Sequence, residues 1–192
     1  MAPSFCIDIS EPEQGRLLDI ARQSIESGLA GGTVLQLDVR NLTGALSIPL
    51  AVFVTLTRFE ALRGCTGSLE SSGPLAQSVA DSAFNTAFHD HRFPTLDASE
   101  IDDTRIEISV LSELEPLAAA NRADLLNRLR AGEDGLLLED GNYRSTFLPK
   151  MWDILSDPEE FLDHLLVKAG LAGGYWSETI GFKRYQALSF NE

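Results

Sequence analysis

Apolar residues recur at helical spacing near the start of the chain. Ser10-Glu11-Pro12-Glu13 has the pattern of a capping box with a proline in the first turn, which is typical of a helix N-terminus. The apolar positions that follow are Leu17, Leu18, Ala21 and Ile25. We therefore predict a helix that begins after Ser10 and ends at Gly28.

The pattern then changes to that of strands. Residues 50–57 are almost continuously apolar and β-branched, which predicts a buried strand. This strand leads into Arg63-Gly64-Cys65, and Gly64 and Gly67 lie on either side of the cysteine. Because glycine permits sharp bends and close backbone approach, we predict a tight turn that presents Cys65 and Arg63 to a cleft. The alternative is that Cys65 packs as a small buried hydrophobic residue.

Helices and strands are interspersed in the rest of the chain. We predict a helix over residues 74–88, a long loop over 89–104 and a strand in which Ile106, Ile108 and Val110 alternate with polar positions. The remaining expectations are a helix from Asn121 to Gly132, a hairpin of residues 136–139 and 143–148, a helix from Asp157 to Gly170 and a final strand over 179–190. Several strands follow one another too closely for crossover connections, which predicts an α+β fold with a mainly antiparallel sheet.

Length and charge restrict the possible functions. A chain of 192 residues suits one domain over residues 1–192, or two small lobes that share it. It has 15 Lys and Arg against 29 Asp and Glu, a net charge of −14. Such a surface repels nucleic-acid phosphates, so we expect no nucleic-acid partner. The negative charge favours basic partners. The alternative is that it only forms a solvated acidic surface.

Cysteine usage and hydropathy predict the compartment. Cys6 and Cys65 have no spacing typical of a disulfide framework. No stretch is long and apolar enough to span a bilayer, and residues 1–10 lack the pattern of a signal peptide. We therefore expect a cytoplasmic protein with reduced thiols and no membrane association.

Cys65 is the candidate nucleophile. A thiol becomes a nucleophile beside a cation, a base or a helix N-terminus. Arg63 is a candidate cation, or it binds a substrate carboxylate with two hydrogen bonds, and His89 is the candidate base. The segment from Thr66 to Gly73 precedes a helix N-terminus, so with Arg63 it is also a candidate anion site for a small-molecule ligand.

His89-Asp90-His91 is a candidate metal-binding segment. Two imidazoles and a carboxylate suit a divalent transition metal, but the spacing differs from that of a helical His-x-x-x-His pair and no third firm ligand is visible. A surface loop is the alternative. We predict no metal site, and the sequence names no cofactor.

The segment from Leu62 to Glu70, with Arg63-Gly64-Cys65 at its centre, resembles the signature of the AMMECR domain family. Bacterial and archaeal members of that family are called AmmeMemoRadiSam system protein A. Thr66 stands where the family usually has isoleucine, and His91 stands where it has proline. The resemblance continues in the family's order through residues 53–56, 87–93, 106–112, 132–136, 147–149, 161–162 and 168–171, followed by Trp176 and Tyr185.

The resemblance implies a fold and a set of site residues. Members of the family have a larger and a smaller α+β lobe with a cleft between them. The positions that match its motifs, and are therefore candidate ligand-binding residues, are Arg63, Gly64, Thr66, Gly67, Asp90, Arg92, Glu107 and Lys168. The family's name implies two partners, a Memo-like protein and a radical SAM protein. Two functions stay open: an enzyme or small-molecule-handling protein centred on Cys65, and a noncatalytic accessory module.

Overall fold

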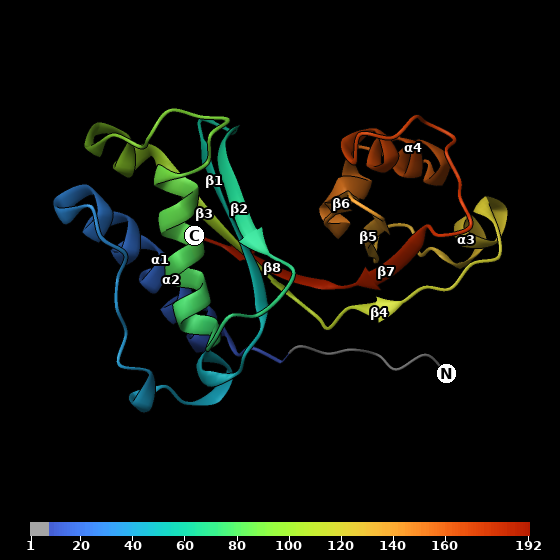
Figure 1. Ribbon diagram of the computed structural model, residues 1–192. Helices are drawn as coiled ribbons and strands as arrows, with labels where there is room; N and C mark the ends of the chain where they lie inside the picture. Colours follow the sequence, from blue (N-terminus) through green and yellow to red (C-terminus); the bar gives the residue numbers. More distant parts are fainter. Residues whose placement is uncertain (1–7) are drawn as a thin grey trace. The chain divides into compact units, whose positions relative to one another are not determined.

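The computed structural model describes residues 8–192 (Figure 1). The chain forms two compact units. Unit 1 extends to Ser112 and also includes Leu188–Glu192, and unit 2 comprises Glu113–Ala187. Cys6, for which we predicted no disulfide, lies outside the described residues.

Two helices of unit 1 begin where the sequence predicts. Helix α1 covers Glu11–Gly31, and the Ser10 backbone N–H and hydroxyl both donate to the Glu13 carboxylate. The helix continues past the predicted stop at Gly28 and ends before Gly32, whose φ of 69° is the left-handed conformation that glycine adopts without strain. Helix α2 covers Leu75–Phe88. Gly28 allows the two helices to approach closely, because a Cβ at this position would overlap the Phe88 ring.

A four-stranded sheet with the order β2-β1-β3-β8 completes unit 1. Its strands are β1 (Ala51–Arg58), β2 (Ala61–Ser68), β3 (Thr104–Leu111) and β8 (Ala187–Asn191). β1 pairs antiparallel with both β2 and β3. Helices α1 and α2 lie against one face of this sheet (Figure 1), and alternate strand residues such as Val54, Leu56 and Ile108 are buried beneath them.

The Arg63-Gly64-Cys65 segment lies within β2, so the prediction of a tight turn is wrong. The turn is at Phe59 and Glu60, which connect β1 to β2 with φ values of 50° and 62°. Two consecutive residues with positive φ are typical of the two-residue hairpin loop, whose twist matches that of the strands, although Asn-Gly is the preferred sequence there. The sequence contains no glycine at this turn, which is why the nearby glycines suggested the wrong position.

The glycines of β2 serve close packing instead of bending. A Cβ on Gly64 would lie 2.9 Å from both Cγ2 and the backbone oxygen of Thr86. A Cβ on Gly67 would lie 2.3 Å from the Val52 carbonyl oxygen. Helix α2 and strand β1 therefore approach β2 at distances that only glycine permits.

Short helical turns connect these elements. Two of them, Val39–Asn41 and Gly44–Ser47, lie between α1 and β1. A third, Ala98–Asp103, lies in the segment that we predicted as a loop over residues 89–104. Asp97 caps this turn by accepting from Ser99 N at 2.9 Å, and Glu100 accepts from Asp97 N at 3.0 Å, so local side-chain hydrogen bonds form the turn where hydrophobic periodicity gave no signal.

Unit 2 contains a second four-stranded sheet, with the order β4-β7-β5-β6. Its strands are β4 (Glu115–Pro116), β5 (Gly135–Asp140), β6 (Tyr143–Phe147) and β7 (Gly181–Tyr185), and β5 pairs antiparallel with β6 and β7. Its helices are α3 (Arg122–Arg128), α4 (Pro158–Lys168) and the turn Pro149–Asp153. The predicted α+β class and the predicted hairpin around Gly141 are confirmed.

Two boundaries in unit 2 differ from the prediction. Helix α3 ends at Arg128 instead of Gly132, because the chain turns at Arg130, which forms an ion pair with the buried carboxylate of Asp134. The predicted final strand divides into β7 and β8, which belong to different sheets. Tyr185 is buried, and its hydroxyl donates to Phe147 O at 3.0 Å. Trp176 is half-buried and stacks on Phe182.

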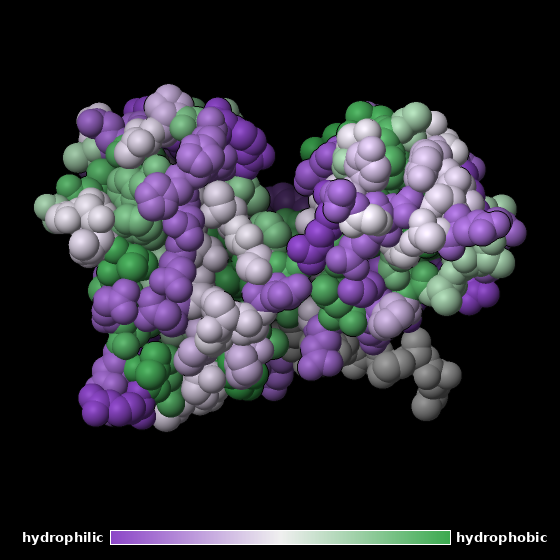
Figure 2. Space-filling model, viewed as in Figure 1, coloured by the Kyte–Doolittle hydropathy of each residue, from purple (hydrophilic) through white to green (hydrophobic). Residues whose placement is uncertain are grey.

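Surface composition follows the net charge. Figure 2 shows hydrophilic residues distributed over the visible face of each unit. The largest exposed hydrophobic side chains include Phe59 of the β1–β2 turn, at 74% exposure, and Leu62, close to it in β2. Among residues 8–192 no helix combines the length and the apolar character that crossing a membrane requires.

Candidate functional site

Cys65 and Glu107 project from the same face of the unit 1 sheet, opposite the face that α1 and α2 cover. Thr55 of β1 is the register partner of Cys65 on one side and of Glu107 on the other. The Thr66 side chain points instead toward α2, and so would a side chain at Gly64, since side chains alternate along a strand. With neighbouring strands about 4.8 Å apart, Cys65, Thr55 and Glu107 form a row roughly 10 Å long across three strands.

The Cys65 sulfur is half-buried and hydrogen-bonded. Thr55 Oγ1 donates to Cys65 Sγ at 3.3 Å. The thiol is therefore neither sealed in the hydrocarbon core nor fully exposed. The Thr55 hydroxyl fixes the direction of the sulfur on the sheet face, which is the positioning that a nucleophile or a ligand contact needs.

Asp90 and Arg92 hold the backbone of Cys65 from the outer edge of the sheet. Asp90 Oδ2 accepts from Cys65 N at 2.9 Å, and Arg92 Nη2 donates to Cys65 O at 2.8 Å. Arg92 also binds both oxygens of the Asp90 carboxylate, at 2.9 and 2.7 Å. These contacts satisfy backbone groups that an edge strand otherwise leaves unpaired.

The two charges at this edge stabilise each other. Hydrogen bonds from Arg92, with a smaller contribution from Cys65 N, hold the pKa of Asp90 far below its usual range. The pKa of Arg92 is raised, chiefly by its hydrogen bonds to Asp90 and to a lesser degree by the charges of Asp90 and Cys65. The guanidinium that is bonded to the Cys65 backbone is therefore that of Arg92, and Asp90 balances its charge.

Arg63 is bound to a carboxylate of its own chain. Its Nε and Nη2 donate to the two oxygens of Glu100 at 3.0 and 2.8 Å, and its side chain is only 13% exposed. Arg58 also donates to Glu100, at 3.1 Å. Hydrogen bonds from Arg63 are the main cause that lowers the pKa of Glu100 to about 2. The two-pronged binding that we predicted for a substrate carboxylate is therefore made by Glu100.

The remaining predicted residues have other contacts. His89 Nδ1 pairs with Asn85 Oδ1 at 3.0 Å, and its ring lies edge-on to Phe84, so the contacts that the structure gives His89 are with α2. Lys168 belongs to unit 2, where its Nζ donates to Thr146 O at 2.8 Å and lies over the Phe147 ring. His91 is exposed. Over residues 8–192 the structure assembles no group of three His, Cys, Asp or Glu side chains suited to a metal.

Thr66 anchors β2 to α2. Its Oγ1 donates to Ser82 O at 3.2 Å and lies 2.7 Å from Thr86 Oγ1, and its N–H donates to the same Thr86 hydroxyl at 3.1 Å. Thr66 and Gly67 line a groove beside α2, whereas Arg63 is not among its lining residues and its guanidinium binds Glu100. The predicted anion site of Arg63 with the Thr66–Gly73 segment is thus not assembled.

Sequence reasoning missed Thr55 and Glu100. Thr55 is separated from Cys65 by ten positions, and only the antiparallel register of the β1–β2 hairpin brings the two together. A two-residue loop at Phe59-Glu60 with regular pairing would place Thr55 opposite Gly64. A register shift between Leu56 and Thr57 brings Thr55 opposite Cys65 instead, so the turn alone does not predict this pair. Glu100 reaches Arg63 from a segment that carries no periodic signal.

The comparisons with known proteins agree with this architecture. The AMMECR1 family model matches residues 18–190. The chain belongs to the AMMECR1 family. A protein of Methanothermobacter thermautotrophicus is 36% identical over 190 residues, which cover 96% of each chain. Protein MJ0810 of Methanocaldococcus jannaschii is 32% identical over 180 residues, which cover 90% of this chain and 86% of the relative.

A solved structure has the same fold. The crystal structure of Uncharacterized Protein PH0010 from Pyrococcus horikoshii matches with a TM-score of 0.85 and 32% sequence identity. The match covers 92% of this chain and 90% of that chain. These AMMECR1-family relatives carry only generic names, so the comparisons establish the family and the fold while the enzyme and accessory roles stay open.

Proposed function

We propose that this AMMECR1-family protein is an enzyme or small-molecule-handling protein in which the Cys65 thiol contacts the ligand. The observation that carries the proposal is the hydrogen bond from Thr55 to Cys65 Sγ on the half-exposed face of the sheet. A cysteine that only fills space needs no hydroxyl donor on its sulfur. The proposal assigns Thr55 as a positioning residue.

The surroundings of Cys65 are rigid and charged. Asp90 and Arg92 hold its backbone N–H and C=O, and the Arg63–Glu100 pair anchors β2 two residues before Cys65. Such a frame keeps a reactive group in one orientation. Asp90 balances the charge of Arg92, so this pair holds the Cys65 backbone without adding net charge beside the sulfur. The predicted contribution of His89 as a base stays a prediction.

Competitive alkylation tests the proposal. Native protein is treated with iodoacetamide, with and without the small-molecule fraction of a host-cell extract, and the Cys65 peptide is quantified by mass spectrometry. We expect the extract to slow labelling of Cys65 and Thr55→Val to weaken that protection. Labelling that is unaffected by any extract fraction, at saturating amounts, would contradict ligand binding at the thiol.

A second candidate function has its own observation. Phe59 and Leu62 are exposed beside a turn whose two residues have positive φ, so the chain tolerates both backbone strain and apolar exposure there. This favours an accessory module that docks through the hairpin, and the family resemblance suggests a Memo-like protein and a radical SAM protein as partners. Pull-down of each partner with Phe59→Ser tests it. Unchanged recovery of both partners would argue against docking through Phe59.

A further inference from the structure

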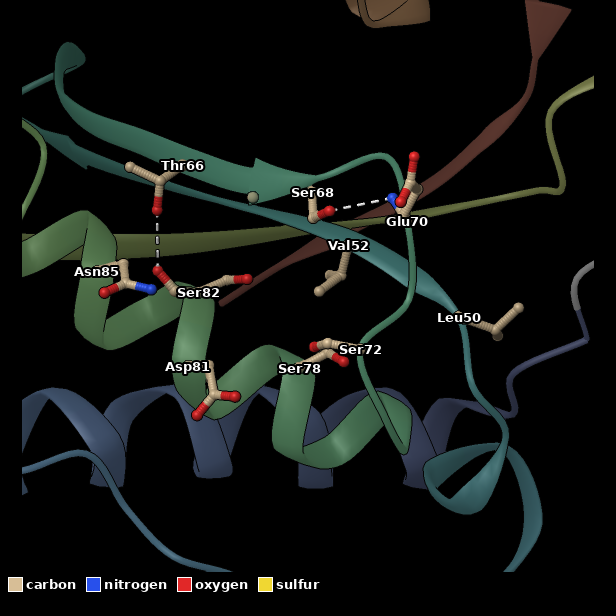
Figure 3. Close-up of a pocket in the computed structure, with 11 residues that line it drawn as sticks. Leu50, Val52, Thr66, Ser68, Glu70, Ser72, Ser78, Asp81, Ser82 and Asn85 are labelled. Carbon is tan, nitrogen blue, oxygen red and sulfur yellow. Dashed lines mark hydrogen bonds between the residues drawn. The ribbon is translucent and has the colours of Figure 1, made fainter.

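A polar groove lies between the end of β2 and the middle of α2 (Figure 3). At one end Thr66 Oγ1 donates to Ser82 O at 3.2 Å, and beyond this contact the strand and the helix lie further apart. Ser72, from the segment that connects β2 to α2, also lines the groove. Leu50 and Val52, at the start of β1, supply its apolar wall. These segments together bound a volume of about 270 Å³.

The groove presents both hydrogen-bond donors and acceptors. Five hydroxyl side chains, two carboxylates and the Asn85 amide line it. Asn85 Oδ1 pairs with His89 Nδ1 at 3.0 Å, so the amide offers the groove its Nδ2, which is a donor. Asp81 Oδ1 accepts from Gln77 Nε2 at 2.9 Å, and its carboxylate offers acceptor positions. A ligand that bonds both side chains therefore donates to Asp81 and accepts from Asn85.

Ser78 adds a hydroxyl without a partner. Ser78 lines the groove and is only 8% exposed, and within residues 8–192 its Oγ makes no hydrogen bond. A helical serine commonly bonds a carbonyl of the preceding turn, and Ser78 does not do so. Because a buried polar atom without a partner is unfavourable, a ligand that bonds this hydroxyl gains affinity. Ser78 lies one turn before Asp81 and two turns before Asn85, so the three side chains share one face of α2.

We propose that this groove binds a neutral polyhydroxyl ligand of monosaccharide size. Each hydroxyl both donates and accepts, so adjacent hydroxyls of one ligand match Asp81, Ser78 and Asn85 together. An ammonium group only donates and cannot accept from Asn85, and a phosphate is repelled by Asp81. The volume is slightly below that of typical ligand pockets, so it suits a single sugar of about twelve heavy atoms. The groove does not include Cys65, and binding there does not depend on the function proposed for the thiol.

Titration of the full chain with D-glucose, D-galactose, D-mannose and D-ribose tests the proposal, with backbone amide shifts in NMR spectra as the signal. We expect saturable shifts with at least one sugar, at millimolar affinity, and the largest shifts at the amides of Gly67, Ser68 and Ser78. Spermidine and inorganic phosphate serve as the cationic and anionic comparisons, and they should cause no saturable shift at these amides. The proposal is overturned if no sugar gives saturable shifts there, or if spermidine or phosphate binds there more tightly than every sugar.

Asn85→Asp tests the donor that the proposal requires. The change keeps an oxygen for His89 but replaces the donating Nδ2 with an acceptor. It should therefore weaken sugar binding about fivefold. The same change adds a negative charge, which would strengthen the binding of an amine, so the sign of the effect separates the two ligand classes. Unchanged or tighter sugar binding by Asn85→Asp would contradict the proposed arrangement.

Ser78→Ala and a matched control locate the ligand. Ser78→Ala should weaken sugar binding about threefold and should also raise the urea midpoint of unfolding, because it removes a buried hydroxyl without a partner. Ser27→Ala removes a hydroxyl of α1 outside the groove and should leave the affinity unchanged. A gain of stability in Ser78→Ala without any loss of affinity would refute the site, and so would equal losses of affinity in the two variants. Cys65 alkylation rates should be the same in both variants, which separates this site from the thiol.

Discussion

Glu100→Gln tests whether the Arg63–Glu100 pair holds β2 in place. The pKa of Glu100 is lowered from its ordinary 4.5 to about 2, chiefly by hydrogen bonds from Arg63. A difference of this size corresponds to about 3 kcal/mol of folding free energy, and screening by solvent at this partly exposed pair reduces it to about 2 kcal/mol. We therefore expect Glu100→Gln to lower the free energy of unfolding by about 2 kcal/mol at pH 7.

The pH dependence follows from the direction of the shift. Because the pKa of Glu100 is lower in the folded state, its stabilisation is fully present above pH 4.5 and is lost as the pH falls toward 2. The loss of stability of the wild type between pH 4.5 and 2 should therefore be steeper than that of Glu100→Gln. Asp103→Asn is the matched control, since Asp103 is exposed and pairs with Arg58 at 3.4 Å, and it should change stability by less than about 0.5 kcal/mol.

Urea unfolding followed by circular dichroism at 222 nm provides the measurement. Helices α1 and α2, with 21 and 14 residues, both belong to unit 1, so this signal reports mainly on the unit that contains Glu100. The same small effect of Glu100→Gln and Asp103→Asn would contradict a stabilising Arg63–Glu100 pair. An unchanged slope of stability against pH below 4.5 in Glu100→Gln would contradict it as well.

Two further changes test the hairpin. Gly64→Ala should destabilise the protein by about 1–3 kcal/mol in urea unfolding, because its Cβ would lie 2.9 Å from the Thr86 backbone oxygen. Gly73→Ala is the control and should be nearly neutral, because its Cβ would meet nothing within 4 Å. Equal effects would contradict close packing of β2 on α2. Glu60→Gly should raise the free energy of unfolding by about 0.5–1 kcal/mol, since φ at this position is 62°. A loss of stability would contradict the strained turn.

The helices and the fold class followed from sequence because their signals are local. The Ser10 cap and the spacing of Leu17 and Ile25 determine α1, and alternation determines β3. The position of Cys65 was mispredicted because glycine has two uses in proteins, bending and close packing, and only the packing of Thr86 against Gly64 distinguishes them. Arg63 was assigned to a ligand because its partner lies 37 positions away in a segment without periodicity.

The sequence also predicts only in part which candidate residues lie in the same structural unit. Cys65 and Glu107 lie on one sheet face because both are register partners of Thr55. Lys168 belongs to the other unit. The cleft between lobes that the resemblance implies stays a prediction.

The rate of alkylation at Cys65 is the most direct test of a functional thiol. The rate constant with iodoacetamide is measured at pH 7.5 for native protein and for protein unfolded in urea, with the Cys6 and Cys65 peptides resolved by mass spectrometry. We expect native Cys65 to react at least as fast as unfolded Cys65, and Thr55→Val to change the native rate. Native Cys65 that reacts many times more slowly than the unfolded thiol, with no effect of Thr55→Val, would show a packing residue and contradict the account.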